Sequence, residues 1–250
     1  MKRNYQRNYS ERMPSVFDQE GRTRKAITTL AVLKQELRVS IERARILVVG
    51  GSSGIVDHYL ADHFAQVIGL DIDEQAVRFA HAQHHHPALA FLMADAQQLP
   101  FSDNNFDAVV CSHVYEHVPD AERLIREIYR VLVPGGCCYF AAGNRLNVME
   151  PHYRLPFLSV IPRPLAHLYM RLAGKGTHYY EKHLSYWGLR RLVASFSIED
   201  YSCRLVHEPT LYSVDYMLPP GSFKQKLAKL LCRYAAWLMP GYIWILKKPT

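Results

Sequence analysis

One short stretch constrains the fold of this chain more than any other, an apolar run that ends abruptly in glycines. Residues 46–49 are apolar and rich in β-branched side chains, which predicts a buried parallel strand. Gly-Gly-Ser-Ser-Gly at 50–54 predicts a tight turn, and 55–64 has the apolar spacing of a helix. Glycines let the backbone approach a ligand closely, and a helix N-terminus favours an electronegative group. Strand, glycine turn and helix therefore predict a nucleotide-binding α/β domain.

An acidic residue ends the next apolar run. Residues 66–70 predict a second strand, and Asp71 follows it about 20 residues after the turn, where a carboxylate suits hydrogen bonds to a ribose diol. Dinucleotides and S-adenosylmethionine are both held in this way. The dinucleotide fingerprint Gly-x-Gly-x-x-Gly is not matched, because Ser52 and Ile55 stand at its second and third glycine positions.

The alternation of strand and helix patterns continues along the chain. Polar or small residues follow the third and fourth predicted strands, namely Asp95 and Ala96, then Ser112 and His113. Asp120 is a suitable N-cap for the helix after the fourth strand. The predicted elements are a helix at 74–84, a strand at 90–94, a strand at 108–112, a helix at 121–132 and a strand at 137–141.

Taken in order, these motifs resemble the class I S-adenosylmethionine-dependent methyltransferases, closest to the small-molecule branch with ubiquinone-type and natural-product enzymes. The resemblance is close over residues 42–143 and looser over 182–196. It implies an α/β fold with a doubly wound, seven-stranded, mostly parallel sheet, an antiparallel last strand and an inserted helical cap. The motifs that carry it are the glycine turn, Gly-Leu-Asp71-Ile-Asp73, Ala-Asp95-Ala96, Asn-Phe-Asp107, Glu116-His-Val-Pro-Asp120 and Arg130-Val-Leu-Val-Pro-Gly-Gly136.

The resemblance implies S-adenosyl-L-methionine as cofactor and a role for each motif. Asp71 would bind the ribose hydroxyls, Ile72 would pack on the adenine, and Asp95 would accept from the adenine amino group. The turn would cover the methionine and ribose parts, and the end of the fourth strand would lie near the transferring methyl. The implied cofactor-binding residues are Gly50, Gly51, Ser52, Gly54, Asp71, Ile72, Asp95, Ala96, Ser112 and His113.

The glycine turn departs from the family pattern at two positions. Val48 stands where the family has an acidic residue that helps to hold the methionine ammonium, and Ser52 replaces the usual middle glycine. These changes leave a second hypothesis open, namely that the protein is a non-catalytic cofactor- or ligand-binding module with the methyltransferase fold. A dinucleotide-dependent oxidoreductase is a further alternative, disfavoured by the turn and by Asp95-Ala96.

The sequence divides into four parts. Residues 1–14 are polar and predict a mobile tail, and 15–143 form the cofactor-binding half, which opens with a helix at 21–41. Residues 144–181 are aromatic and Pro-rich, and a plain doubly wound domain has no counterpart to them. They predict a cap or lid over the substrate pocket. Residues 182–250 predict a helix capped by Ser185, the last two strands and a basic amphipathic helix at 223–238.

The predicted reaction is methyl transfer to a small-molecule acceptor, with oxygen favoured and a sugar, glycolipid or polyketide-like compound suiting the cap. An oxygen acceptor loses a proton, which a nearby histidine can take. The predicted catalytic histidines are, in order of preference, His152, His178 and His113. No metal site is predicted, because the triple histidine at 84–86 is better explained as the exposed end of a helix.

Composition narrows the range of partners. The net charge of +7 is scattered and lacks a nucleic-acid-binding motif, so no nucleic-acid partner is expected. The basic helix at 223–238 leaves peripheral membrane contact open, and a homodimer is also left open. Five cysteines without a Cys-x-x-Cys pair, and no apolar signal segment at the start, predict a cytoplasmic protein without disulfides.

Overall fold

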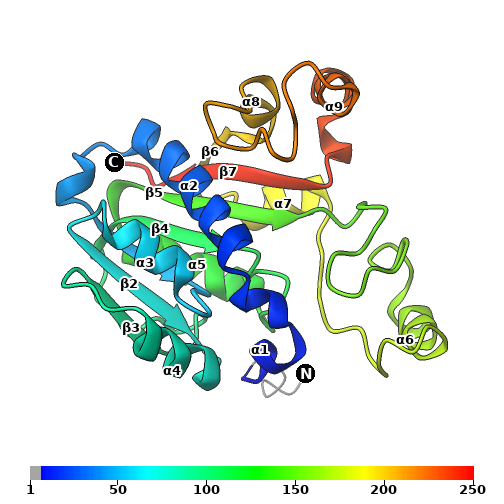
Figure 1. The fold of residues 1–250 in the computed structure, drawn as a ribbon, viewed down its shortest axis with the longest axis horizontal. Helices are drawn as coiled ribbons and strands as arrows, with labels where there is room; N and C mark the ends of the chain where they lie inside the picture. Colours follow the sequence, from blue (N-terminus) through cyan, green and yellow to red (C-terminus); the bar gives the residue numbers. More distant parts are fainter. Residues whose placement is uncertain (1–6) are drawn as a thin grey trace.

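The computed structural model describes residues 7–250, and its centre is a seven-stranded sheet with the order β3-β2-β1-β4-β5-β7-β6 (Figure 1). Strands β1 to β5 are parallel, and β7 runs antiparallel between β5 and β6. This confirms the predicted sheet. The strands are β1 (Arg45–Val49), β2 (Gln66–Asp71), β3 (Leu89–Met93), β4 (Phe106–Ser112), β5 (Leu132–Gly143), β6 (Ser197–Asp200) and β7 (Gly241–Lys247).

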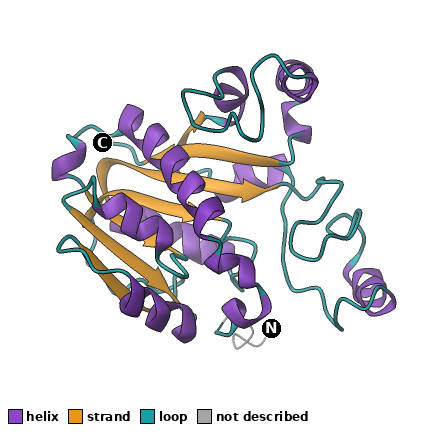
Figure 2. Ribbon diagram, in the orientation of Figure 1, coloured by secondary structure: helices purple, strands orange, loops and turns teal. Residues whose placement is uncertain are grey.

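Helices cover both faces of the sheet (Figure 2). Helices α2 (Gln19–Glu36), α3 (Ile55–Ala61) and α8 (Ser202–His207) pack on one face. Helices α5 (Ala121–Val131) and α7 (Tyr186–Leu192) pack on the other. The remaining helical elements are α1 (Tyr9–Arg12), η2 (Pro14–Phe17), η3 (Ile41–Arg43), α4 (Glu74–Gln83), α6 (Arg163–Leu172), α9 (Phe223–Tyr234) and η4 (Ala236–Leu238).

The apolar run of β1 is buried because its side chains alternate between the two faces. Leu47 and Val49 join the cluster under α5 and α7, whereas Ile46 and Val48 join the cluster under α2 and α3. A parallel strand covered on both faces reads in sequence as a continuous apolar run. The predicted caps also form: the side chain of Asp120 accepts from Arg123 N at 2.9 Å, and Ser185 Oγ accepts from Gly188 N at 3.4 Å.

The segment that precedes α2 lies against the carboxyl ends of the strands. Ser10 N donates to Asp73 Oδ2 at 2.7 Å, and the Ser53 hydroxyl donates to the Val16 carbonyl at 2.5 Å. The predicted mobile tail at 1–14 partly falls on residues 1–6, which lie outside the described residues, and its mobility stays a prediction. The contacts of α1 and η2 nevertheless attach this segment to the loops after β1 and β2.

The long connection after β5 folds around a small apolar cluster of its own. Leu155, Leu158 and Tyr179 are buried there with Ala166 and Met170 of α6. Figure 1 shows α6 away from the sheet, at the side of the molecule where the strands end. The segment therefore has its own core.

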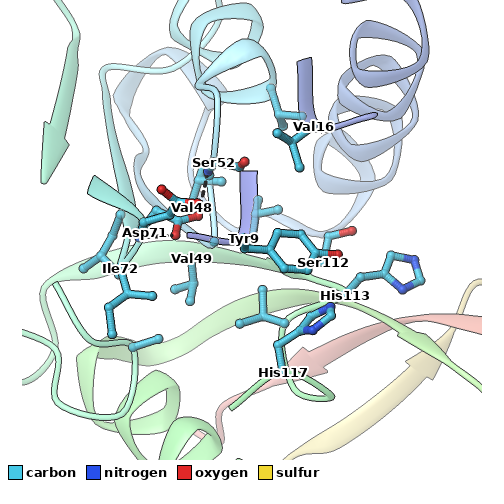
Figure 3. Close-up of a pocket in the computed structure, with 18 of the residues that line it drawn as sticks. Tyr9, Val16, Val48, Val49, Ser52, Asp71, Ile72, Ser112, His113 and His117 are labelled. Atoms are coloured by element: carbon cyan, nitrogen blue, oxygen red, sulfur yellow. Dashed lines mark hydrogen bonds between the residues drawn. The ribbon is translucent and has the colours of Figure 1, made fainter. Parts of the chain in front are cut away.

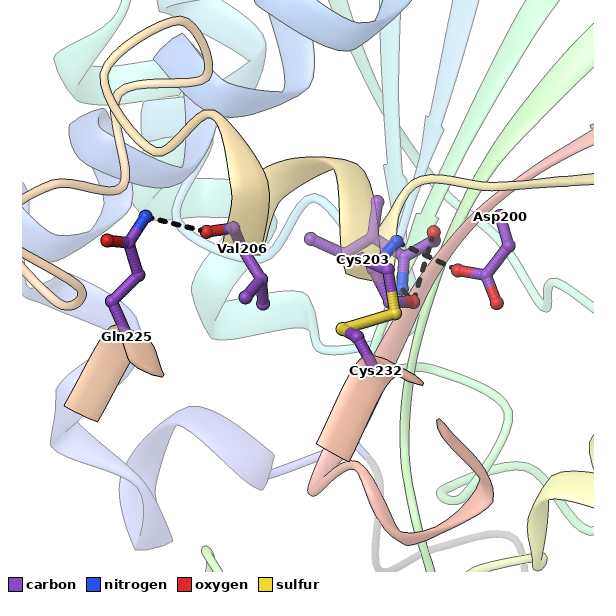
Figure 4. Close-up of a disulfide and its surroundings, with 7 residues drawn as sticks. Asp200, Cys203, Val206, Gln225 and Cys232 are labelled. Carbon is purple, nitrogen blue, oxygen red and sulfur yellow. Dashed lines mark hydrogen bonds between the residues drawn. A yellow bond between two sulfur atoms is a disulfide. The ribbon is translucent and has the colours of Figure 1, made fainter. Parts of the chain in front are cut away.

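The expectation that the chain has no disulfide is wrong. Cys203 of α8 and Cys232 of α9 form a disulfide, and their Cα atoms lie 5.6 Å apart (Figure 4). The two cysteines are 29 residues apart in sequence, and only the packing of α9 against α8 brings them together. Gln225 Nε2, which donates to the Val206 carbonyl at 2.9 Å, holds the same two helices. Cys111, Cys137 and Cys138 are buried free thiols, as expected of strand residues.

Helix α9 buries less of its apolar surface than its spacing predicts. Ala228 and Leu231 pack against the core, but Leu227, Leu230 and Tyr234 are 47%, 54% and 67% exposed. A helix whose apolar side chains extend around more than one face cannot bury all of them against a single neighbour. An apolar strip of α9 therefore remains on the surface.

Candidate functional site

A cavity of about 360 Å³ lies at the carboxyl ends of β1, β2 and β4 (Figure 3). This is the edge at which open α/β sheets bind ligands, and the volume falls in the usual range for small-ligand sites. Nine of the ten predicted cofactor residues line it. They are Gly50, Gly51, Ser52, Asp71, Ile72, Asp95, Ala96, Ser112 and His113. Gly54, the tenth, begins α3 just behind the turn with a φ of 76°.

The glycine turn brings backbone, rather than side chains, to the cavity wall. Gly50 has a φ of 71°, and a Cβ at this position would lie 2.6 Å from Val114 Cγ2. Ser52 also has a positive φ, 54°, which a serine adopts at a cost of roughly 1–2 kcal/mol. Its N–H donates to Asp71 Oδ2 at 2.9 Å. The turn is thereby fixed to the end of β2.

Asp71 is held so that both carboxylate oxygens face defined donors. Oδ2 accepts from Ser52 N, and Oδ1 accepts from Asp73 N at 2.9 Å. Burial raises the pKa of Asp71 above its usual range, and these two N–H donors oppose the shift. Each oxygen keeps further lone pairs, so the carboxylate can also accept from a vicinal diol.

The segment before α2 and the first turns of α2 close the cavity from the side opposite the strands. Tyr9, Arg22 and Lys25 line it, and the Tyr9 ring lies 4.9 Å from the ring of His117, centroid to centroid (Figure 3). Burial lowers the pKa of Arg22, whereas Asp57 and Asp71 among its acidic neighbours raise it. The sequence left open that the helix before the first strand packs over the cofactor mouth, but it did not assign Tyr9, Arg22 or Lys25 to the site. The only signal for this wall was the pair of basic residues three apart, Arg22 and Lys25, at the start of the helix.

Position 48, where the methyltransferase family has an acidic residue and this chain has Val48, lies on the cavity wall. Val48 lines the cavity as an apolar side chain. A different acid, Asp57 of α3, is fully buried beneath the turn, where a Cβ on Gly51 would lie 2.5 Å from its Oδ1. Burial raises the pKa of Asp57 to about 7, and the Asp71 charge adds to this rise. Among the described cavity-lining residues, the carboxylates are Asp71, Asp73 and Asp95.

Histidines and buried carboxylates gather at the end of the cavity nearest β4. Each carboxylate has an imidazole nitrogen within 4 Å. Glu150 Oε1 lies 2.7 Å from His152 Nδ1 and 3.3 Å from His183 Nε2. The other two short distances are 3.3 Å between Glu116 Oε1 and His113 Nδ1, and 3.8 Å between Glu181 Oε1 and His117 Nδ1.

Burial and neighbouring charges together set the pKa values of this cluster. Burial alone would raise the pKa of the Glu116 carboxyl, but the imidazoles of His113, His117 and His183 together outweigh it and hold this pKa at about 2. The pKa of Glu150 is held at about 2 in the same way by His152 and His183. Burial lowers the pKa of His117 to about 4. Two buried carboxylates are therefore ionised at neutral pH.

The three predicted catalytic histidines do not converge. His113 and His152 line the cavity, His113 with a φ of 56° at the end of β4. His178 is exposed in the segment after α6, where its ring lies beside those of His167 and Tyr180, and it is not among the lining residues. Its catalytic role remains an untested prediction. Glu150 and Glu181 were missed, although each stands two residues before a histidine, in Glu-Pro-His152 and Glu-Lys-His183.

Comparison with known proteins agrees with this geometry. A family described as a methyltransferase domain matches residues 47–140. The chain carries a class I S-adenosylmethionine-dependent methyltransferase domain. S-Adenosylmethionine is accordingly the cofactor of this methyltransferase domain. The nine lining residues listed above are compatible with it, because they offer two carboxylates, Asp71 and Asp95, and the backbone of the glycine turn.

Two curated relatives and one solved structure resemble the methyltransferase domain. A fatty-acid O-methyltransferase from Mycolicibacterium smegmatis is 37% identical over 124 residues, 48% of this chain and 42% of that protein. A ubiquinone biosynthesis O-methyltransferase from Coxiella burnetii is 28% identical over 147 residues, 58% of this chain and 59% of that protein. The chain thus spans about half the length of these relatives.

The structural comparison concerns the fold alone. An S-adenosylmethionine-dependent methyltransferase from Mesorhizobium loti superposes with a TM-score of 0.57 at 18% identity, over 88% of this chain and 98% of that one.

Among the described residues, no helix has the length and apolar character needed to cross a membrane.

Proposed function

We propose that the protein transfers the methyl group of S-adenosylmethionine to an oxygen atom of a small-molecule acceptor. The observation that carries this proposal is the cavity, where Asp71 and Asp95 face a cofactor-sized space while Ser112, His113 and His152 end it. The O-methyltransferase names of both relatives support oxygen as the acceptor atom.

The chemistry needs alignment more than activation of the leaving group. Methyl transfer from a sulfonium is an in-line displacement, so the protein contributes chiefly by fixing the acceptor oxygen behind the methyl carbon. A hydroxyl acceptor also releases a proton. His152 is the proposed proton acceptor, because Glu150 accepts from its Nδ1 and so keeps Nε2 as the basic nitrogen. His113 is the alternative at the same end of the cavity.

The proposed acceptor has an apolar chain, which narrows the sugar, glycolipid or polyketide-like class to its lipid members. The segment after β5 exposes Val148, Met149 and Phe157, which are 59%, 46% and 53% accessible, near Pro151 and His152 of the cavity wall. The name of the mycobacterial relative, a fatty-acid O-methyltransferase, supports the same class.

A lipid acceptor gives a role to the exposed face of α9. Phe223, Leu227, Leu230 and Tyr234 are exposed, and the helix also carries Lys224, Lys226, Lys229 and Arg233. A basic helix with exposed apolar side chains binds anionic membrane surfaces. The proposal is peripheral contact of α9 with such a surface, where lipid acceptors are found.

The first experiment is calorimetric titration of the purified protein with S-adenosylhomocysteine. Micromolar binding is expected, followed by turnover of a radiolabelled methyl group into long-chain acids or hydroxylated lipids. Binding without turnover of any acceptor class would favour a non-catalytic module, the alternative that Val48 and Ser52 keep open. An absence of binding at millimolar ligand would contradict the proposal.

A further inference from the structure

The histidine–carboxylate cluster contains a set of side chains whose donor atoms converge on one point. Glu150 is fully buried, and its Oε1 lies 2.7 Å from His152 Nδ1 and 3.3 Å from His183 Nε2. Ligand atoms around a tetrahedral zinc lie roughly 3.3 Å apart, given bonds of about 2.0–2.1 Å. The Glu150–His183 separation matches this value, the shorter Glu150–His152 separation is that of a hydrogen bond which an ion would replace, and all three donor atoms lie within 4.8 Å of one another.

The three ligands come from two segments that meet only in the folded chain. Glu150 and His152 begin the connection after β5, and His183 lies just before α7. The main chain of 150–153 fixes the carboxylate, because Glu150 Oε2 accepts from His152 N at 2.9 Å and from Tyr153 N at 2.7 Å. Oε1 is thereby aimed at both imidazoles.

A second trio adjoins the first and opens it to the cavity. Glu116, His117 and His152 also offer donor atoms within 4.8 Å of one another, so His152 belongs to both trios. Its ring centroid lies 4.8 Å from that of His117 and 5.7 Å from that of His183. His117 and His152 line the cavity, which provides an entry path from solvent.

We propose that Glu150, His152 and His183 bind a divalent metal ion of the zinc class at the acceptor end of the cavity. Two imidazoles and one carboxylate suit zinc, and such a set leaves a coordination position open. The proposed site adjoins the cavity through His152, which lines it together with His117.

The site extends the proposed function, on which its catalytic role rests. An acceptor hydroxyl bound at the open position would have its pKa lowered by the metal, so its oxygen would reach the methyl carbon as an alkoxide. The proton leaves to solvent. In the metal-free protein His152 is itself the proton acceptor, whereas in the metal-bound protein it is a ligand.

The test is titration of chelator-treated, untagged protein with Co²⁺, followed by visible absorption and by displacement with Zn²⁺. One Co²⁺ per chain with intense d–d bands is expected for wild type. Glu150→Gln and His183→Asn should each weaken binding at least tenfold. His85→Asn, which changes the exposed triple histidine, is the matched control and should bind as wild type does. His152→Asn, on the cavity wall, serves if the two buried changes prevent folding.

Two outcomes would contradict the proposed metal site. One is equal weakening by His85→Asn, which would place the ion on the surface histidines. The other is unchanged Co²⁺ affinity in the three cluster variants. Binding of S-adenosylhomocysteine is measured on the same samples, both as a check of folding and as a separate test of the proposed function. Metal binding without cofactor binding would leave the site standing and remove its role in methyl transfer.

Discussion

Among single residues, Arg22 offers the sharpest test of the cavity, because it and Lys25 contribute the cations of a lining whose carboxylates are Asp71, Asp73 and Asp95. The expected partner is the methionine carboxylate of the cofactor. We predict that Arg22→Gln weakens S-adenosylhomocysteine binding about tenfold or more, the usual loss for a hydrogen bond to a charged group. Binding of 5′-methylthioadenosine, which lacks that carboxylate, should stay the same in calorimetry.

Asp71→Ala is the matched comparison for Arg22. This change should weaken the binding of S-adenosylhomocysteine and of 5′-methylthioadenosine by the same factor, because both ligands carry the ribose diol that the Asp71 carboxylate is expected to bind. If Arg22→Gln lowers the affinity for both ligands equally, the assignment of Arg22 to the carboxylate end of the cofactor is contradicted.

Asp57 gives a pH dependence of stability. Burial raises its pKa to about 7 in the folded protein from an ordinary value of 3.8. The folded state therefore binds the proton more tightly than the unfolded state. The resulting contribution to the free energy of unfolding is fully present below pH 4 and is lost as pH rises through 7. Asp57→Asn should consequently raise the Tm relative to wild type more at pH 8 than at pH 5.

The control for Asp57 is Asp215→Asn, which removes an exposed carboxylate. Thermal unfolding without ligand is the measurement for both variants. The free energy at stake is about 1.4 kcal/mol for each unit of pKa shift. A Tm difference that is the same at both pH values would mean that Asp57 titrates in its ordinary range.

The residues that sequence could identify are those that a strand end places by itself. Asp71, Asp95 and Ser112 follow apolar runs, and the carboxyl ends of parallel strands meet at one edge. Arg22 and Glu150 could not be found in this way. The length and composition of the segment after β5 predicted a cap over the pocket, but no local pattern says which side chains of that segment, or of the helix before β1, reach the edge. Their positions depend on packing between distant parts of the chain.

At the scale of elements, periodicity predicted the strands and most helices, and packing decided what periodicity leaves open. Helix α2 ends at Glu36, earlier than the predicted 41, because Leu37 adopts an extended conformation before the chain enters β1. Strand β5 begins at Leu132, earlier than the predicted 137, and includes Pro134, Gly135 and Gly136. The pairing of α8 with α9, and hence the disulfide, had no local signal.

The N-terminal segment is the element whose function can be tested directly. We predict that deletion of residues 1–17, which retains Asp18 as the N-cap of α2, speeds dissociation of S-adenosylhomocysteine at least tenfold. The segment covers the cavity through Tyr9 and Val16 and is attached at Asp73 and Ser53. Stopped-flow displacement measures the rate. An unchanged rate would show that the segment does not retain the ligand.

At the scale of the whole molecule, the cavity exists because three separate parts of the chain meet at one edge of the sheet. The strands supply Asp71 and Ser112, the N-terminal segment supplies Tyr9, and the connection after β5 supplies His152. Motifs predicted the strand residues, and the sequence also predicted His152 in a cap after β5, whereas the contribution of Tyr9 follows only from the tertiary fold. The domain model matches 47–140 and stops short of both the N-terminal segment and the connection after β5.

The exposed face of α9 makes a prediction about the intact protein at a membrane. Vesicles rich in phosphatidylglycerol should sediment the wild type, and binding should fall with salt because Lys224, Lys226 and Lys229 contribute to it. The double change Leu227→Ser and Leu230→Ser should weaken binding at least tenfold, since burial of one leucine contributes about 1.5–3 kcal/mol. Leu172→Ser, on α6 and 79% exposed in the native protein, is the control and should leave binding unchanged. Equal binding to neutral vesicles, or an equal loss in the α6 variant, would mean that general surface hydrophobicity, rather than the basic helix, determines the contact.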